Sequence, residues 1–477
     1  MSSESCMDIW AVVPEMMLAG LTVALVPVAG LARGRWRRAP MLAALVGLAA
    51  TMVVTGLMLR LTPQAAFCGT WAVDRFATAY KLLIEFGAFI TILVLASHFD
   101  GHAQMPHAPV LALFATVGGM GLVASLDLGL IVLFLQMLSM PSYLLAGLVR
   151  GDPRGREAAM KYFLYAAAAL AVMAYGLTFL FGLTGSLELR AIGRGLGSAD
   201  KVWIVVAFGL VLVGYAFEIT AVPFHFWAPD VYEGGTAPAI GFISVIPKMA
   251  AFGGLLRMLL EAFPRAEAAW PLVAALAVAS MTLGNLAALR QDRLKRLLAY
   301  SSIAQAGYVL MAVAVAERAD GALAAIGFYL LAFLLMNLGA FLVIAQVERT
   351  FGTDAFEAIR GLARRSPIPA AAMALALLSL AGIPPLAGFA GKVFLLTATI
   401  DGGMTWLAVI GAANMAVGLF YYVRIIAEMY FEAPSRREPV TGGLGYALGL
   451  VLSAAGTLVF GIIPNVALAL GALGRLL

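Results

Sequence analysis

The chain has 477 residues, of which 62% are hydrophobic and only 12% are charged, and its formal net charge is +5. A soluble domain of ordinary composition has roughly 25% charged residues, so this composition excludes a soluble globular enzyme. The excess of basic residues does not indicate nucleic-acid binding, because Lys and Arg gather in short loops between apolar runs. We therefore predict a polytopic helical membrane protein, all-α in fold class.

Apolar runs recur from end to end, each near the length of about twenty residues that crosses ~30 Å of hydrocarbon. We predict about fourteen transmembrane helices, at residues 10–31, 41–60, 77–97, 108–125, 127–149, 159–183, 202–222, 237–260, 270–289, 297–316, 321–346, 368–399, 404–430 and 442–472. The acidic start of the chain and the basic loop after the first run argue against a cleavable signal peptide.

Basic residues follow the odd-numbered spans. They are Arg33, Arg35, Arg37, Arg38, Arg150, Arg154, Arg156, Arg290, Arg293, Lys295, Arg296, Arg360, Arg364, Arg365, Arg436 and Arg437. Because loops rich in Lys and Arg stay in the cytoplasm, this bias places these loops inside and both termini on the outer, periplasmic side.

Two predicted spans contain breaks. The seventh ends in residues 221–229 with Pro223 and Pro229, and the twelfth is interrupted at residues 382–386 with two adjacent prolines. Proline frees backbone carbonyls that, at membrane depth, only protein or water can satisfy. The breaks lie five spans apart. Because five is an odd number of crossings, two successive five-span units would start on opposite sides of the membrane and have opposite orientations. Such inverted repeats, with ion sites at broken helices, are typical of secondary transporters.

This reasoning divides the chain into four parts. We predict N-terminal helices 1–3 at residues 1–107, a first repeat of helices 4–8 at residues 108–260, a second, inverted repeat of helices 9–13 at residues 270–430, and a C-terminal helix 14 at residues 431–477.

Four ionisable residues lie within or at the ends of predicted spans: Lys161, Glu218, Lys248 and Lys392. A charge at membrane depth costs at least ~2.5 kcal/mol on insertion scales, so such residues normally line a polar path or pair inside the bundle. Lys248 and Lys392 are flanked by apolar residues and are predicted proton carriers. Lys161 is either a carrier or an interfacial lysine, and Glu218 either a carrier or half of a structural ion pair.

Other polar residues allow both a functional and a structural interpretation. His225, in the seventh-span break, is a candidate proton relay or a cap for freed backbone groups. Gln136, Asn337 and Gln305 either hold water in a path or hydrogen-bond between helices.

Histidine and cysteine give no metal motif. His98, His102 and His107 are assigned to a solvated loop, and two cysteines are too few for an iron–sulfur or zinc framework. Cys6 and Cys68 are both expected on the outer, oxidising side, where a disulfide between them is one possibility.

Six segments carry a resemblance to a known family: EAAMKYFL at 157–164, VPFHFWAPDVYEG at 222–234, GNLAALR at 284–290, LKRLLAYSSI at 294–303, MNLGAF at 336–341 and GIPPLAGFAGK at 382–392. Through them the chain resembles the antiporter-like membrane subunits of bacterial respiratory complex I, most closely the subunit N family of NADH:quinone oxidoreductases. The match runs from about the fourth to the thirteenth predicted span.

The resemblance implies a fourteen-helix subunit whose two inverted units each hold a half-channel, joined by a central line of charged residues and water. Lys248 matches the family's central lysine, Lys392 the lysine of its broken twelfth helix near the outer half-channel, and Lys161 its lysine on helix six. It further implies the bacterial inner membrane, the other membrane-arm subunits as partners, and no redox centre in this chain. FMN, iron–sulfur clusters and quinone are expected in other subunits.

Three positions depart from the family pattern. Gln136 stands where the family usually has a glutamate on helix five, Glu218 where it usually has a lysine on helix seven, and Gln305 where a histidine is often found. One hypothesis is a rewired relay in which Glu218 and Lys248 form the switchable pair. The other is that this unit has lost its inner proton-uptake step.

Three alternatives to a proton-translocating complex I subunit remain at this stage. They are a subunit of a multi-chain cation/proton antiporter, a subunit of a membrane-bound hydrogenase and a non-pumping scaffold of complex I.

Overall fold

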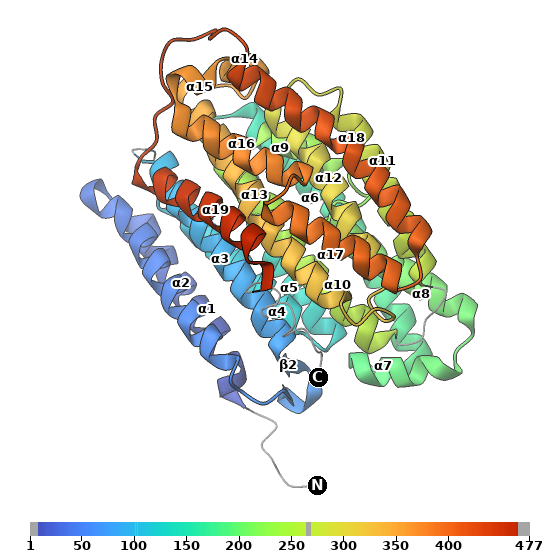
Figure 1. Ribbon diagram of the computed structural model, residues 1–477. Helices are drawn as coiled ribbons and strands as arrows, with labels where there is room; N and C mark the ends of the chain where they lie inside the picture. The colour runs from blue at the N-terminus through green and yellow to red at the C-terminus, as the bar shows by residue number, and fades with distance from the viewer. Residues whose placement is uncertain (1–7, 101, 103, 150, 264–268, 466–477) are drawn as a thin grey trace.

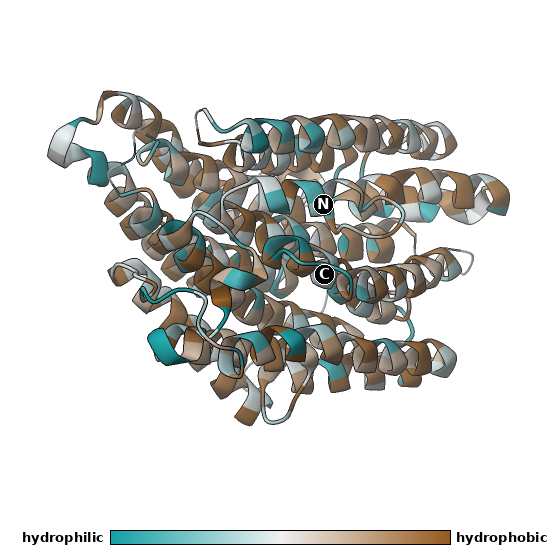
Figure 2. Ribbon diagram, turned by 90° about the horizontal axis from the view of Figure 1, so that it is seen from above, coloured by the Kyte–Doolittle hydropathy of each residue, from teal (hydrophilic) through white to brown (hydrophobic). Residues whose placement is uncertain are grey.

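The computed structural model describes residues 8–100, 102, 104–149, 151–263 and 269–465, so Cys6 and Arg150 lie outside the described residues. The long helices lie side by side in one bundle (Figure 1), and their residues are mostly hydrophobic (Figure 2). The prediction of a polytopic helical membrane fold is confirmed.

Within the described residues, 12 helices are long and apolar enough to cross a membrane. They are α1 (Val13–Leu31, extended by the 3-10 turn η1, Ile9–Val12), α2 (Ala39–Met58, preceded by η2, Gly34–Arg38), α3 (Arg75–His98), α4 (His107–Ala124), α5 (Leu128–Ala146), α6 (Pro153–Thr184), α8 (Lys201–Glu218), α10 (Ala237–Ala262), α11 (Trp270–Ala288), α13 (Ala322–Phe351), α18 (Thr405–Tyr430) and α19 (Leu444–Ile462).

The other two predicted spans are also helical. α12 (Leu294–Val313) occupies the tenth, and α16 (Pro367–Ala381) with α17 (Ala387–Asp401) occupies the twelfth. Neither is among the helices that meet the length and hydropathy criteria for crossing a membrane, so the exact count of fourteen spans is not established.

Both predicted breaks are present. α8 ends at Glu218, and the chain turns before the short helix α9 (Trp227–Gly234). α16 ends at Ala381, where Gly382 adopts a left-handed φ of 89° and closes the helix. Glycine takes this conformation without the strain that a Cβ would cause.

The two predicted repeats pack in the same order. In the first, α4 packs on α5, and α6 packs on both pieces of the broken pair α8 and α9. In the second, α11 packs on α12, and α13 packs on both pieces of α16 and α17.

Two helices form the centre of the bundle. The most apolar windows of α10 and α13 are 100% buried, whereas those of α1, α2, α6, α18 and α19 are only 33% buried. A helix that is hydrophobic all round either lies inside a core or faces membrane lipid, and neighbouring helices cover α10 and α13 on every side. The bundle thus holds Lys248, on α10, at its centre, while α1 and α2 lie at one edge (Figure 1).

Aspartate begins several of these helices. Asp74, Asp127, Asp152 and Asp200 accept hydrogen bonds from the first backbone N–H groups of α3, α5, α6 and α8, respectively, which intrahelical bonds cannot satisfy. Asp74 also forms a fully buried ion pair with Arg257 of α10, at 3.0 Å. The start of α3 is therefore fixed to the central helix.

The chain between α2 and α3 adds one short β-hairpin, which the sequence did not predict, to the all-α bundle. Strands β1 (Gln64–Ala66) and β2 (Trp71–Val73) pair antiparallel around the 3-10 turn η3 (Phe67–Gly69). The loop satisfies its backbone groups by pairing with itself and is held to the bundle by Trp71, whose Nε1 donates to the carbonyl of Ala11 at 3.3 Å. Cys68, in the same loop, is disulfide-bonded.

Short helices that the sequence did not predict lie in the connections. They are α7 (Leu189–Gly195) with the following 3-10 turn η4 (Leu196–Ser198), between α6 and α8, and α14 (Phe356–Ile359) and α15 (Leu362–Arg365), between α13 and α16.

Candidate functional site

Lys392 lies at the break between α16 and α17. Its side chain is buried, and its Nζ donates to the carbonyls of Leu380 at 2.7 Å and Ala381 at 3.1 Å. These carbonyls end α16 and have no partner within the helix, and the negative end of a helix dipole favours a cation. Gly382 leaves room for this approach, because a Cβ there would lie 2.9 Å from the lysine side chain. The break thus forms the binding site for the lysine.

Lys248 occupies the centre of the bundle on α10. It is 2% exposed, and its Nζ donates to the hydroxyl of Ser302 at 2.5 Å and to the carbonyl of the same residue at 3.0 Å. Both acceptors are neutral. Among the described residues, no carboxylate pairs with Lys248 or Lys392, so neither charge is fixed by a direct counter-ion.

Polar side chains of α12 and α18 join the surroundings of these two lysines. Ser301 and Tyr422 exchange a hydrogen bond of 2.5 Å, and the Gln305 amide donates to the Tyr422 hydroxyl at 3.0 Å. The same amide reaches the carbonyl of Leu380 at 3.2 Å, the carbonyl that also binds Lys392. We call Ser301, Ser302, Gln305 and Tyr422 the α12–α18 relay.

The relay is continuous except at one step. Ser302 binds Lys248, while its neighbour Ser301 begins the bonds that lead to Lys392. Tyr329 of α13 donates to the carbonyl oxygen of the Gln305 amide, which fixes that side chain. Two roles were predicted for Gln305: holding water in a polar path, or linking helices by hydrogen bonds. Its bonds to Leu380, Tyr422 and Tyr329 link α12 to α16, α18 and α13, and the same bonds form part of the relay.

Glu218, the last residue of α8, is buried in a different place. It accepts a hydrogen bond from the Ser139 hydroxyl of α5, and its second oxygen has no hydrogen-bond partner in the described structure. Glu218, Ser139 and Gln136 line one cavity of about 10 Å³, close to the smallest size that holds one water. Gln136 is otherwise exposed.

The expected contact between Glu218 and Lys248 is not found. No ion pair joins these two residues in the described part of the chain, since Glu218 bonds to α5 and Lys248 to α12. The described contacts therefore give no direct ion pair in support of the hypothesis that Glu218 and Lys248 form a switchable pair, and it stays a prediction. The reason is tertiary: α8 presents Glu218 to α5, and that contact could not be read from the position of Glu218 in its own span.

Lys161 is separated from both buried lysines. Its side chain is 38% exposed and pairs with Asp230 of α9 at 2.7 Å and with Glu157 at 2.8 Å. This geometry favours the interfacial interpretation of Lys161 over the buried carrier.

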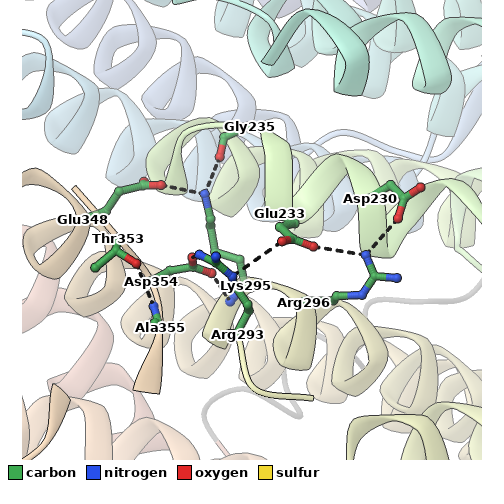
Figure 3. Close-up of polar contacts among 10 residues, drawn as sticks. All are labelled: Asp230, Glu233, Gly235, Arg293, Lys295, Arg296, Glu348, Thr353, Asp354 and Ala355. Carbon is green, nitrogen blue, oxygen red and sulfur yellow. Dashed lines mark hydrogen bonds and ion pairs between the residues drawn. The ribbon is translucent and has the colours of Figure 1, made fainter. Parts of the chain in front are cut away.

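Asp230 belongs to a network that connects the two predicted repeats (Figure 3). Arg296 at the start of α12 contacts Asp230 at 2.8 Å and Glu233 at 3.1 Å. Arg293 also contacts Glu233, at 3.6 Å, and Asp354, at 3.2 Å. The basic residues that predicted a cytoplasmic loop thus also hold α9 against α12.

A buried lysine extends this network. Lys295 pairs with Glu348 of α13 at 2.6 Å and donates to the carbonyl of Gly235 at 2.7 Å (Figure 3). The other oxygen of Glu348 accepts from the first backbone N–H of α10, at Ala237. The network therefore fixes one end of the helix that contains Lys248.

The remaining predicted residues lie apart from the relay. His225 is buried in the break after α8 with its ring against Phe226, and its Nδ1 has no hydrogen-bond partner in the described residues. Asn337 links α13 to Ser244 of α10 at 2.7 Å, the helix-linking role. His98 is not in a loop: it ends α3 and bonds to Tyr446.

No group of three or more potential metal-ligating residues occurs in the described part of the chain.

Sequence reasoning missed Ser139 and Ser302, the partners of Glu218 and Lys248, and Tyr329 and Tyr422, the partners of Gln305. Serine and tyrosine are common in membrane helices, where most simply bond within or between helices. The only available signal was the YSS segment at residues 300–302, which belongs to one of the segments that carry the family resemblance.

The fold and these buried groups define a polytopic helical membrane protein with ionisable side chains inside its bundle. A family model described as "NADH:quinone oxidoreductase/Mrp antiporter, TM" matches residues 125–418. The chain belongs to this family.

Curated relatives agree over most of the chain. NADH-quinone oxidoreductase subunit N of Trichlorobacter lovleyi is 40% identical and covers 85% of each chain. The subunit N of an Anaeromyxobacter species is 39% identical over 94% of this chain and 93% of its own.

Solved structures of related membrane complexes have the same fold. A chain of respiratory complex I from Thermus thermophilus is 34% identical with a TM-score of 0.83, over 97% of this chain and 100% of that one. A chain of the Mrp complex from a Dietzia species has a TM-score of 0.87 at 21% identity, over 98% and 97% of the two chains, which shows the shared fold alone.

Proposed function

We propose that this chain is a proton-translocating subunit of the membrane arm of a bacterial NADH:quinone oxidoreductase, respiratory complex I, in the position that its relatives call subunit N. The names of those relatives and the likeness to the Thermus complex support the assignment. The observation that supports proton transfer is the α12–α18 relay, whose neutral hydrogen-bonding groups lie between Lys248 and Lys392 with one interruption, between Ser302 and Ser301.

The surroundings of the two lysines suit proton release. A lysine paired with a carboxylate keeps its proton, because losing the proton would leave the carboxylate buried and alone. Lys248 and Lys392 are held by hydroxyl and carbonyl oxygens instead. Each can therefore exist neutral without leaving a buried counter-charge, which a group that passes protons requires.

Glu218 is proposed as a separate proton-binding group in the first repeat. Its unpartnered oxygen and the small cavity shared with Gln136 provide room for a proton and one water. His225 and Lys161 are proposed to act at the ends of this unit rather than in the relay, because neither contacts it.

Coupling to redox chemistry requires a change that arrives from outside the chain. Quinone reduction in another subunit would alter the charge or water near one end of this membrane subunit. Only a difference in interaction energy between two states can move the proton, so the redox event must change the stability of a charged lysine.

The wider arrangement follows from the same proposal. Two inverted repeats, at residues 108–260 and 270–430, lie between helices 1–3 (residues 1–107) and helix 14 (residues 431–477), in the bacterial inner membrane with both termini periplasmic. The repeated packing order of α4–α9 and α11–α17 supports the two units. The partners are the other complex I subunits and the bilayer, and FMN, iron–sulfur clusters and quinone belong to those other subunits.

The test replaces the buried lysines in the assembled complex. We expect Lys248→Ala and Lys392→Ala to assemble and to lose most coupled proton transport in membrane vesicles. Lys201→Ala, an exposed lysine at the start of α8, is the matched control and should pump normally. A non-pumping scaffold would keep normal proton transport in all three variants. Purification without an NADH dehydrogenase module would instead favour the antiporter or hydrogenase alternatives.

A further inference from the structure

The N-terminal helices contain a second cluster of buried charged residues. Glu15 of α1 and Lys81 and Glu85 of α3 are 6%, 2% and 0% exposed. Lys81 and Glu85 are one helical turn apart and so share a face of α3. None of the three bonds to Lys248, Lys392 or the α12–α18 relay in the described structure.

The contacts within this cluster leave one carboxyl without a cation. Lys81 Nζ lies 2.6 Å from Glu15 Oε1 and 5.2 Å from the centre of the Trp71 ring. Glu85 Oε1 accepts a hydrogen bond of 2.8 Å from Thr55 of α2, and Glu85 Oε2 has no hydrogen-bond partner in the described part of the chain.

In the described residues, no other charged side chain bonds to Glu85. On α10, which packs on α3, Arg257 pairs with Asp74, Lys248 bonds to Ser302 and Glu261 pairs with Arg190. On α13, Glu348 pairs with Lys295 and Arg349 donates to the carbonyl of Ser97, near the opposite end of α3. Helix α19 contributes the Tyr446 hydroxyl and the Gly445 N–H, also at that opposite end. With both carboxyls ionised, the cluster would carry one net negative charge in a place shielded from water, which is strongly unfavourable.

We propose that Glu15, Lys81 and Glu85 form a proton-binding site, in which Glu85 holds one exchangeable proton and Lys81 neutralises Glu15. The cluster lies toward the end of the bundle that carries the β1–β2 hairpin, since Glu85 is ten residues from the start of α3 and Thr55 three residues from the end of α2.

This inference is independent of the proposed relay, and it predicts a spectroscopic signal rather than a change in turnover. Infrared spectra of the assembled complex in membranes, recorded in H₂O and D₂O, resolve the C=O stretch of a protonated carboxyl from that of a carboxylate. Glu85→Gln should remove one such band. Glu432→Gln, at an exposed glutamate in the connection after α18, is the matched control and should remove none.

A second variant covers the case in which Glu85→Gln does not assemble. Thr55→Val removes the hydrogen bond to Glu85 Oε1 with little change in shape, so it should shift the same band without abolishing it. The proposal is overturned if the band persists in Glu85→Gln or if the spectrum of Thr55→Val is the same as that of the wild type.

Discussion

The most specific prediction from the relay concerns the hydroxyl of Tyr422. This side chain is 1% exposed, and its hydroxyl is the only group that joins Ser301 to Gln305 in the described structure. Tyr422→Phe keeps the ring and removes the hydroxyl, which breaks the line between the surroundings of Lys248 and those of Lys392.

Two magnitudes follow from the contacts. Two hydrogen bonds are lost, of 2.5 and 3.0 Å, and at about 0.5–1.5 kcal/mol each the loss of stability is about 1–3 kcal/mol. A positioned proton donor or acceptor typically accelerates proton transfer by about 10²–10⁴-fold. We therefore expect a folded subunit in which proton passage through the relay is slowed by about a hundredfold or more.

The assay compares proton uptake per electron in vesicles that contain the assembled complex. Tyr446 provides the control, because it is equally buried and its hydroxyl shares a hydrogen bond of 2.7 Å with His98, away from the relay. Tyr446→Phe should lose about 0.5–1.5 kcal/mol of stability and pump normally. Equal proton output in the two variants, with equal assembly, would refute the relay as the route between Lys248 and Lys392.

Three further predictions concern other charged groups. Glu218→Gln should lower proton output with normal assembly, since glutamine cannot carry a proton; unchanged output contradicts its role. Burial opposes ionisation of Asp230, but hydrogen bonds from Lys161 and Arg296 hold the pKa of that carboxyl below its usual value. Asp230→Asn should therefore lower the free energy of unfolding by about 1 kcal/mol near neutral pH. This difference between the variant and the wild type should vanish as the pH falls below the ordinary carboxyl pKa of ~3.9 and through the lowered pKa of Asp230. Thermal unfolding at several pH values measures the difference. Arg257→Met, which strands the buried carboxylate that begins α3, should cost about 3–5 kcal/mol, and a loss under 1 kcal/mol in the same assay would contradict a buried pair.

Local chemistry made the outline of the fold predictable. Hydrophobic length specifies where a chain can cross a membrane, and all fourteen predicted ranges contain helix in the described structure. Proline chemistry is equally local, so the breaks after Glu218 and Ala381 could be located without any knowledge of neighbours. The hairpin before α3 was missed because its strands are only three residues each.

The partners of the charged residues could not be predicted in this way. Lys248 binds a serine 54 residues away, and Glu218 binds one 79 residues away. Apart from the YSS segment that contains Ser302, nothing in either serine's own span distinguishes it from a serine that bonds within its helix. The pairing of Glu218 with Lys248 was inferred from two positions that depart from the family pattern, and in the described structure the two side chains bond to serines of α5 and α12 instead.

The sequence by itself determined that this chain spans a membrane, where its helices break, and that Lys248 and Lys392 lie among apolar residues. These properties follow from the transfer free energy of each segment and from the missing donor of proline. The tertiary structure alone decided which neutral groups hold each lysine, because hydrogen bonds between helices depend on which faces meet. It also showed that the basic loop of Arg293 and Arg296 forms ion pairs with α9, a contact that a count of loop charges does not contain.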